Sequence, residues 1–314
     1  MTAVVQEWVV ENVAWASAQP RLSVLIPFLN DNPCDLIAAL DREARALGGA
    51  VEVVLLDDGS GNDELAGDVV GAIEDAGMPA RHVRLVANEG RSKGRNRLAR
   101  NARAPHLLFL DSDMLPDAPD FLGRYLALID NDNPAVVVGG FSLEQAPERP
   151  EHRLHRKLAE RSDCAPACER RKMPEKYVFT SNLLIRRDVF QEEAFDEAFV
   201  GWGWEDVEWG VRISRKHPIQ HVDNAATHLG LDPAPIIAIK YEQSGANFAR
   251  ILRAHPDVVC DYPTYRAAKV LKRAPLRSLW RPMLKALAIT EGAPIGLRAI
   301  AMRLYRIAAC VEAI

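Results

Sequence analysis

Residues 106–116 read HLLFLDSDMLP, in which an apolar run over 106–110 is followed by two aspartates. A continuous apolar run without alternation is typical of a strand buried on both faces, as in a parallel sheet. Asp111 and Asp113 follow the run, and two carboxylates one residue apart can reach the same Mg²⁺ or Mn²⁺ ion if the backbone turns between them. The stretch therefore predicts a buried strand with a metal site at its end. The alternative is a solvated turn with capping aspartates.

Similar strands alternate with helices on both sides of this stretch. Apolar runs occupy 22–28, 51–56 and 135–139, with a shorter one at 84–87. Between them lie segments whose apolar residues recur about every 3.6 positions, namely 35–47, 64–76 and 92–102. Strands that alternate with helices form βαβ units. The first 140 residues therefore predict a doubly wound α/β half.

Polar residues cluster where the predicted strands end. Asn30 follows the first strand, Asp57 and Asp58 the second, and Asp111 and Asp113 the fourth. Sheets of this kind bind ligands beyond the carboxyl ends of their strands, so one acidic crevice is expected there. The loop after the first strand, LNDNPCD, contains no glycine. That argues against a dinucleotide-binding dehydrogenase and against a P-loop NTPase.

The composition bounds the chain's organisation and location. With 314 residues, 48% hydrophobic and 26% charged, the chain has an ordinary folded composition. A net charge of −4 gives no overall attraction to nucleic acid. The five cysteines are scattered, Glu7 and Glu11 interrupt the N-terminal apolar stretch, and no apolar run is long enough to span a bilayer. We therefore expect a cytoplasmic protein.

The second half is more varied. Residues 141–180 are polar and predict a loop with a short helix over the crevice, 177–187 a strand, and 233–255 a helix. Cys164 and Cys168 lack a second ligand pair at finger spacing, which argues against a zinc site.

Six segments, in order, resemble the family 2 glycosyltransferases, which have the GT-A fold. They are LSVLIPFLN, VVLLDDGS, NEGRSKGRNRLARNA, LLFLDSDMLP, SNLLIRRDVF and GWGWEDVEWGVR. The last resembles the Trp-Gly-x-Glu-Asp segment of galactosyltransferase-type enzymes. The resemblance covers roughly residues 20–230. It implies an N-terminal extension (1–20), a nucleotide-sugar-binding half (21–140) and an acceptor-binding half (141–264), followed by a tail (265–314).

The resemblance implies a donor site along the strand ends. Pro27 and Asn30 would lie in the loop that touches the nucleotide, and Asp57, Asp58 and Gly59 would contact uracil and ribose. The alternative for the two aspartates is capping of the next helix. The diphosphate would lie near a helix start with cations. The remaining donor-site candidates are Arg91, Lys93, Asn96, Asp111, Ser112 and Asp113. Arg97, Arg100 and Arg103 are expected on a solvated helix face.

The resemblance also implies a divalent cation, Mn²⁺ or Mg²⁺. Asp113 would be its direct ligand and Asp111 would orient the ribose or the metal's waters. His228 follows the Glu-Asp pair at the spacing of a third ligand in many GT-A enzymes, and imidazole does bind Mn²⁺.

Glu205 and Asp206 are the expected acceptor-side carboxylates. A single inverting displacement needs a base for the acceptor hydroxyl, and Asp206 is assigned to that role. Glu205, Trp202 and Trp204 would contact the acceptor, since tryptophan faces stack on sugar rings. The alternative is that both carboxylates only complement a helix dipole. Trp209 is expected in the core.

The tail carries ten Lys or Arg and two Glu over residues 265–314. Two amphipathic segments rich in Leu, Trp and Arg suit peripheral contact with the inner face of a cell membrane. The alternatives are packing on the catalytic domain and a dimer contact.

The sequence thus predicts an inverting, metal-assisted glycosyltransferase that uses a nucleotide sugar, with UDP favoured by the Asp-Asp-Gly-Ser turn. The acceptor would be a carbohydrate or a lipid-linked sugar in bacterial polysaccharide or glycolipid assembly, and no nucleic acid partner is expected. Two alternatives remain: a sugar-phosphate nucleotidylyltransferase, and a non-catalytic transferase-like binding module.

Overall fold

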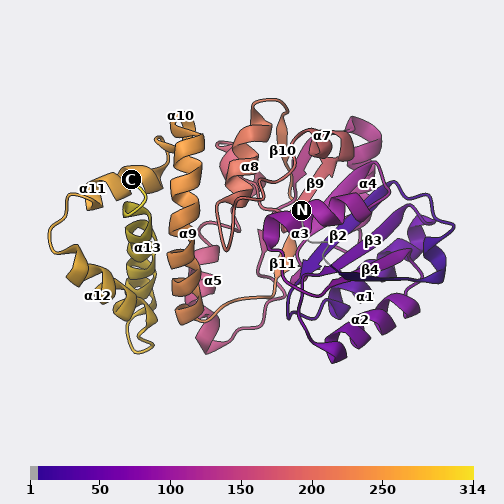
Figure 1. Cartoon of the computed structure of the whole chain (residues 1–314), viewed down its shortest axis with the longest axis horizontal. Coiled ribbons are helices and arrows are strands. Elements are labelled where there is room, and N and C mark those ends of the chain that lie inside the picture. Colours follow the sequence, from indigo (N-terminus) through magenta and orange to yellow (C-terminus); the bar gives the residue numbers. More distant parts are fainter. Residues whose placement is uncertain (1–5) are drawn as a thin grey trace.

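The computed structural model describes residues 6–314, apart from the side chain of Arg277. Figure 1 shows a sheet flanked by helices beside a layer of C-terminal helices, drawn in orange and yellow. Most strands of the sheet come from the N-terminal half, and the chain ends within the helical layer.

An eight-stranded sheet organises this described part of the chain, in the order β1-β4-β3-β2-β5-β9-β7-β10. Its centre is parallel, since β4, β3, β2 and β5 pair in that sense. The pairings of β1 with β4 and of β9 with β5 and β7 are antiparallel. The strand bounds are β1 Glu7–Glu11, β2 Leu22–Phe28, β3 Val51–Asp57, β4 Ala80–Leu85, β5 His106–Leu110, β7 Val136–Val138, β9 Asn182–Arg186 and β10 Ile219–His221.

A second, three-stranded sheet lies next to the first and has the order β6-β11-β8. Its strands are β6 Met114–Pro116, β8 Phe141–Ser142 and β11 Ala226–His228. Only three residues separate β5 from β6, so Asp111 and Asp113 lie in the short connection between the two sheets.

Helices cover both faces of the large sheet. The apolar sides of α1 (Cys34–Ala44), α2 (Asp63–Asp75) and α4 (Phe121–Asp132) fill one core. Those of α3 (Arg91–Asn101), α7 (Arg187–Glu192) and α8 (Glu205–Ser214) fill the other, with Trp209 fully buried as predicted. Strands β2, β3 and β5 are buried on both sides, as their continuous apolar runs predict.

Two strand predictions are wrong in their bounds. The predicted strand at 84–87 is β4, which begins at Ala80 and pairs parallel with β3. The predicted strand at 177–187 is limited to β9, because Tyr177 ends a 3-10 helix, residues 178–181 form no strand and Arg187 begins α7. The short β4 pattern was hidden by Arg81 and Arg84, whose guanidiniums pair with acidic side chains.

The N-terminal extension is part of the sheet. Strand β1 adds antiparallel to the edge of β4. Asn12, which is buried, then ties the chain to the α2–β4 corner through four side-chain hydrogen bonds and accepts a fifth from the N–H of Trp15.

The basic tail packs on the domain, as one of the predicted alternatives has it. Helix α13 (Ile295–Val311) lies against α9 (Ala234–Ala254) and α5 (Arg153–Ala159) in a shared apolar core. The other helices here are α6 Ala167–Arg170, α10 Pro256–Val259, α11 Pro263–Leu271 and α12 Arg277–Ile289. Over the described residues, no helix has both the length and the apolarity that crossing a bilayer requires.

Candidate active site

The register of the small sheet brings Asp113 and His228 together. Met114 of β6 pairs with His228 of β11, and the Nε2 atom of His228 lies 3.1 Å from Oδ2 of Asp113. The backbone at Gly230 is so close that a Cβ there would overlap Oδ2 of Asp113. Two residues 115 positions apart are therefore held side by side by backbone pairing.

The protonation of this pair is set by mutual attraction. Burial by itself would raise the pKa of Asp113, but the hydrogen bond and charge of His228 outweigh it and lower that pKa. Burial would likewise lower the pKa of His228, whereas Asp113 and then Asp111 raise it. An anionic carboxylate and an imidazole nitrogen converge on one point, which is the donor set that Mn²⁺ accepts.

Asp206 lies at the start of α8, across the cavity from this pair. The preceding Gly-Trp-Gly-Trp loop turns through positive φ at Gly201, Gly203 and Trp204, which aims the first turn of α8 inward. The hydroxyl and the backbone N–H of Thr180 donate to the two carboxylate oxygens of Asp206, at 3.0 and 3.3 Å.

The environment of Asp206 favours a general base. Burial and then the neighbouring charge of Glu205 raise the pKa of Asp206 to about 7, although Arg95 opposes the rise. A carboxyl with a pKa near neutrality can take up a proton in the reaction and release it afterwards. Glu205 is buried, and its Oε2 atom has no hydrogen-bond partner in the protein.

Arg95 joins the two sides of the site and was not singled out from the sequence. It is almost fully buried, and an Nη atom donates to Oδ1 of Asp111 at 2.8 Å. Its charge also acts on Glu205 and Asp206. The available signal was its spacing of four residues from Arg91, which places both on one face of α3.

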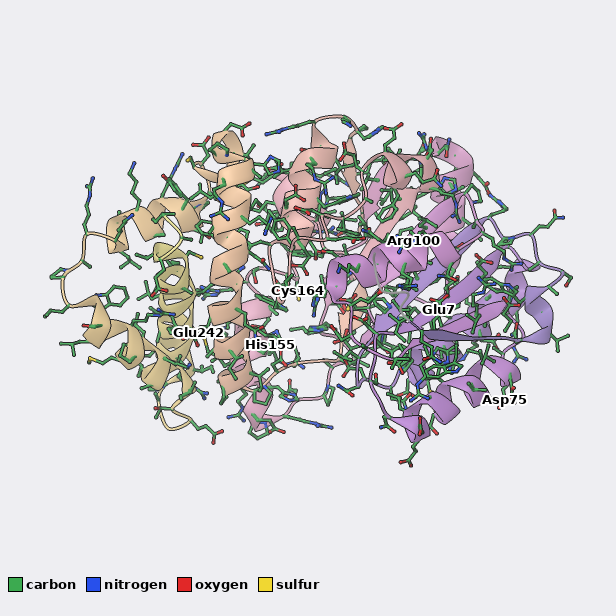
Figure 2. All side chains as sticks on the ribbon, viewed as in Figure 1. Glu7, Asp75, Arg100, His155, Cys164 and Glu242 are labelled. Carbon is green, nitrogen blue, oxygen red and sulfur yellow. The ribbon has the colours of Figure 1, made fainter. Side chains whose placement is uncertain are left out.

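Asp111, Asp113, Glu205, Asp206 and His228 border one cavity of about 250 Å³, whereas Arg95 and Thr180 contact these carboxylates from outside its lining. Eight of the predicted site residues line it: Arg91, Asp111, Asp113, Trp202, Trp204, Glu205, Asp206 and His228. Sequence reasoning missed further polar lining residues from the helical half, namely His155, Asp163, Lys240, Tyr241 and Arg306. Figure 2 shows His155 between the sheet half and the layer that carries α9.

The predicted base-and-ribose residues lie at the neighbouring strand ends, outside the cavity lining. Asp57 is fully buried, and its Oδ1 accepts the N–H of Ser60. Both oxygens of Asp58 accept backbone N–H groups, from Glu89 and Gly90, at the start of α3. Neither aspartate caps the next helix as the alternative predicts, because the N-cap of α2 is Asn62. Contact of either aspartate with a nucleotide stays a prediction.

Gly59 makes this close approach possible. Its φ is +85°, and a Cβ there would stand 2.5 Å from the backbone nitrogen of Asn88. Asn30 also has a positive φ, and its backbone N–H donates to the Ser60 hydroxyl at 2.8 Å. Pro27 at the end of β2 lies beside this turn, through its pairing with Leu56.

Three other predicted donor residues have different surroundings. The amide of Asn96 is buried and bonds to the backbone of Phe195 and to Glu197, so it ties α3 to the 195–197 loop. Lys93 is exposed, and Ser112 is partly exposed between the two aspartates. None of the three lines the cavity among the described residues.

The prediction that Arg97, Arg100 and Arg103 lie on a solvated helix face is wrong for two of these three arginines. Arg97 pairs with Glu89 and Glu7, which ties α3 to β1. Arg103 pairs with the fully buried Glu52, and its guanidinium stacks 3.7 Å from the ring centroid of Trp15. Arg100 is exposed, as expected.

The two tryptophans predicted to contact the acceptor pack against aromatic side chains of α9. The ring centroid of Trp202 lies 5.8 Å from that of Tyr241, and Trp204 packs 4.9 Å from Phe248. The indole Nε1 of Trp204 is buried without a hydrogen-bond partner.

The residues present fit a divalent cation that is partly ligated by substrate. Among residues 6–314, no three His, Cys, Asp or Glu side chains are grouped closely enough to hold a metal ion by themselves. Asp113 and His228 supply two ligands. Oxygens of a bound diphosphate and water would have to supply the others, which is how Mg²⁺ is usually held.

Comparison with solved structures defines the class of protein. The fold is similar to that of the mannosyltransferase PcManGT from Pyrobaculum calidifontis in complex with GDP-Man and Mn²⁺, with a TM-score of 0.58 over 96% of this chain and 89% of that one, at 15% identity. It is also similar to Staphylococcus aureus TarS 1-349, with a TM-score of 0.53 over 93% and 88%, at 15% identity. The chain therefore has the GT-A fold of glycosyltransferases.

Sequence comparison then gives the family. The model of glycosyl transferase family 2 matches residues 23–193, and the chain belongs to that family. A validoxylamine A glucosyltransferase of Streptomyces hygroscopicus subsp. limoneus is 32% identical over 62% of this chain and 48% of its own length. The uncharacterized glycosyltransferase YfnE of Bacillus subtilis is 26% identical, over 62% and 60%. The chain thus spans about half the length of such relatives.

Proposed function

We propose that this glycosyltransferase moves a hexosyl group from a UDP-sugar to an acceptor hydroxyl with inversion. The observation that carries the proposal is the convergence, around one cavity, of the Asp113–His228 pair and of Asp206 with its pKa near 7. Support for a hexosyl donor comes from the name of the Streptomyces relative. Support for UDP comes from the Asp-Asp-Gly-Ser turn and from a TarS structure in complex with UDP, similar at a TM-score of 0.50.

The proposed reaction is one displacement at the anomeric carbon. The acceptor oxygen forms a bond to that carbon while the bond to the β-phosphate oxygen breaks, and the electron pair leaves with the diphosphate. Asp206 takes the acceptor's proton. Thr180 fixes the orientation of the Asp206 carboxylate by two hydrogen bonds, so that one oxygen is presented to the hydroxyl.

Charge on the leaving diphosphate is balanced from the sheet side. Arg91 lines the cavity at the first turn of α3, where cations and helix N–H groups favour phosphate. Arg95 neutralises Asp111, so that this carboxylate does not repel the diphosphate. A divalent cation held by Asp113 and His228 would neutralise charge on the leaving group.

The test is a donor panel assayed with Mn²⁺ or Mg²⁺. UDP-sugars, GDP-sugars and simple glycoside acceptors are mixed with the protein, released nucleotide is measured, and the anomer formed is read by NMR. We expect UDP release that EDTA abolishes, an inverted product, and a loss of about 10²–10⁴-fold in turnover for Asp206→Asn. The matched control is Asp68→Asn, on the exposed face of α2.

The same assay separates the alternatives. A nucleotidylyltransferase would form pyrophosphate from a nucleoside triphosphate and a sugar 1-phosphate, and a binding module would lose no activity in Asp206→Asn. Retention of configuration would overturn the assignment of Asp206 as the base.

We propose in addition that the outer face of the tail contacts an anionic membrane surface. Several large apolar side chains of this face are more than half exposed, namely Val270, Leu276, Leu279, Met283 and Ile300. Exposed Lys269 and Arg273 lie among them. Apolar and basic side chains on one surface favour anionic lipid, which would suit a lipid-linked acceptor in envelope polysaccharide assembly.

A further inference from the structure

The C-terminal helix contributes a cation to the wall of the active-site cavity. Arg306 of α13 lines the cavity and is partly buried. Its guanidinium carbon lies 4.9 Å from the ring centroid of Tyr241 and 5.7 Å from that of Trp204. A segment outside the family match thus reaches the acceptor side of the site.

Arg306 differs in its pairing from the other Lys and Arg side chains that line the cavity. The Nζ atom of Lys240 lies 2.5 Å from Asp232, and an Nη atom of Arg91 lies 3.9 Å from Glu205. Within residues 6–314, Arg306 has no carboxylate within the 4.0 Å of an ion pair. Burying a cation without a counter-charge is costly, so this arrangement suits a ligand that brings one.

Arg306 and the adjoining Trp204 each present a hydrogen-bond donor without a partner. Its Nε–H and the indole Nε1–H of Trp204 are both buried without an acceptor in the protein. Lys176 adds positive charge nearby, since burial and then the charge of Arg306 lower its pKa. Asp163 is the cavity carboxylate on which Arg306 acts, at a distance longer than an ion pair. Two adjoining donors without acceptors, one of them on a guanidinium, favour an oxyanion.

The position of Arg306 distinguishes acceptor from donor. Under the proposed function, the donor's diphosphate lies beside Asp113, His228 and Arg91. Arg306 instead adjoins Trp204, in the loop that leads to Asp206, and Tyr241 on α9. Aromatic faces beside a guanidinium suit a sugar ring that carries an anionic group.

On this basis, which rests on the proposed function, we propose that Arg306 is a specificity-determining residue that binds an oxyanion, phosphate or carboxylate, on the acceptor. A guanidinium matches such groups with paired N–H donors, whereas a neutral sugar offers weaker partners.

The test measures the binding of three acceptor probes by calorimetry: methyl glucoside, glucuronate and glucose 6-phosphate. Each is titrated into the full chain with UDP and Mg²⁺ at saturation, and again without them. We expect both anionic sugars, or one of them, to bind at least tenfold more tightly than the neutral sugar, the better one showing whether carboxylate or phosphate is the natural group. Hydrogen bonds to a charged group of ~1.5–3 kcal/mol correspond to about ten- to hundredfold.

Substitutions assign the preference to Arg306. Arg306→Gln should abolish it, and Arg306→Lys should keep part of it. Arg303→Gln, one turn earlier on α13 and outside the cavity lining, removes the same charge and should leave the preference unchanged. Melting curves of all three variants show whether they fold.

Three results would overturn the proposal. One is equal or absent binding of the three sugars to the wild type, and another is an anion preference that survives Arg306→Gln. The third is displacement of the anionic sugars by UDP, which would assign Arg306 to the donor. The titration of UDP and Mg²⁺ alone tests the proposed function separately, and Arg306→Gln should bind UDP as the wild type does.

Discussion

Two properties of the Asp206 carboxylate, its orientation and its pKa, bear on its proposed role as a base. It is fixed in orientation by Thr180, and its pKa is raised to about 7 by burial and by Glu205. In the proposed role of Asp206 as the base, the first property would set the direction of proton transfer and the second its pH range.

We predict that activity follows the ionisation of Asp206. Since a base must be unprotonated, kcat/KM should rise about tenfold per pH unit below about 7 and level off above it. Initial rates from pH 5 to 9 at fixed Mn²⁺ measure this profile. A rate that does not change between pH 5 and 8 would contradict the assignment.

The same shift has a consequence for stability. The pKa of Asp206 is raised above its ordinary value of 3.8, so between about pH 4 and 7 the folded state holds a proton that the unfolded state has lost. Its contribution to the free energy of unfolding therefore falls as the pH rises through that window. Asp206→Asn should raise the melting temperature at pH 8 by about 2 °C or more, and raise it less at pH 4.

Gly230 is predicted to be essential to the metal site because a side chain there would occupy the place of the Asp113 carboxylate. Gly230→Ala should raise the Mn²⁺ concentration for half-maximal activity by about 10–100-fold, the range seen when the surroundings of a metal ligand are disturbed. The control is Gly296→Ala, which no neighbouring atom within 4 Å would oppose. Equal Mn²⁺ dependence in the two variants would refute the prediction.

At this scale, sequence reasoning finds residues whose role depends on local pattern. Asp113 and Asp206 are recognisable because each adjoins a strand or helix end. Arg95 and Arg306 are not, because their partners come from elements far away in the sequence, and an arginine on a helix is most often solvated. The backbone contacts of Asp58 are equally hidden, since they depend on how closely β3 approaches the start of α3.

At the scale of elements, the strands and helices of the first half follow from their apolar spacing. β2 and β5 have the predicted bounds. β4 differs because its arginines interrupt the pattern, and β1 was not expected because residues 7–11 contain only three apolar positions. An edge strand forms where a neighbouring strand offers unpaired backbone groups, and the local sequence does not reveal that neighbour.

The attachment of β1 gives a prediction about the N-terminal extension. Asn12 donates to Ile73, Ala76 and Met78 and accepts from Trp15 and Ala80. Asn12→Ala leaves these buried backbone groups unsatisfied, so the free energy of unfolding should fall by roughly 2–3 kcal/mol. Urea titration measures it, and exposed Gln19→Ala, seven residues later, should change stability little.

At the scale of the whole molecule, the tail has two faces. The inner face of α13 packs against α5, α9 and α11, whereas the outer surface on α11, α12 and α13 presents exposed apolar and basic residues. Sequence periodicity revealed that the tail is amphipathic. Periodicity does not show which element covers the apolar side, because that depends on tertiary packing.

The outer face predicts binding to anionic vesicles. Replacing Leu279 and Met283 by serine should reduce flotation with phosphatidylglycerol vesicles at least several-fold, since each loses buried apolar area in the bilayer interface. Neutral phosphatidylcholine vesicles should bind weakly. As a control, exposed Val13 and Val86 in the sheet half are replaced in the same way. Equal flotation of the two double variants would rule out this face.

The division of the cavity wall has a consequence for engineering. The sheet half carries Asp111, Asp113 and Arg91, whereas α9 and α13 carry Tyr241, Lys240 and Arg306. Because α9, α12 and α13 share one apolar core with α5, these four helices pack as one block. A chimaera that exchanges the C-terminal layer between relatives should therefore exchange α5 with it, and the acceptor preference should follow the exchanged block.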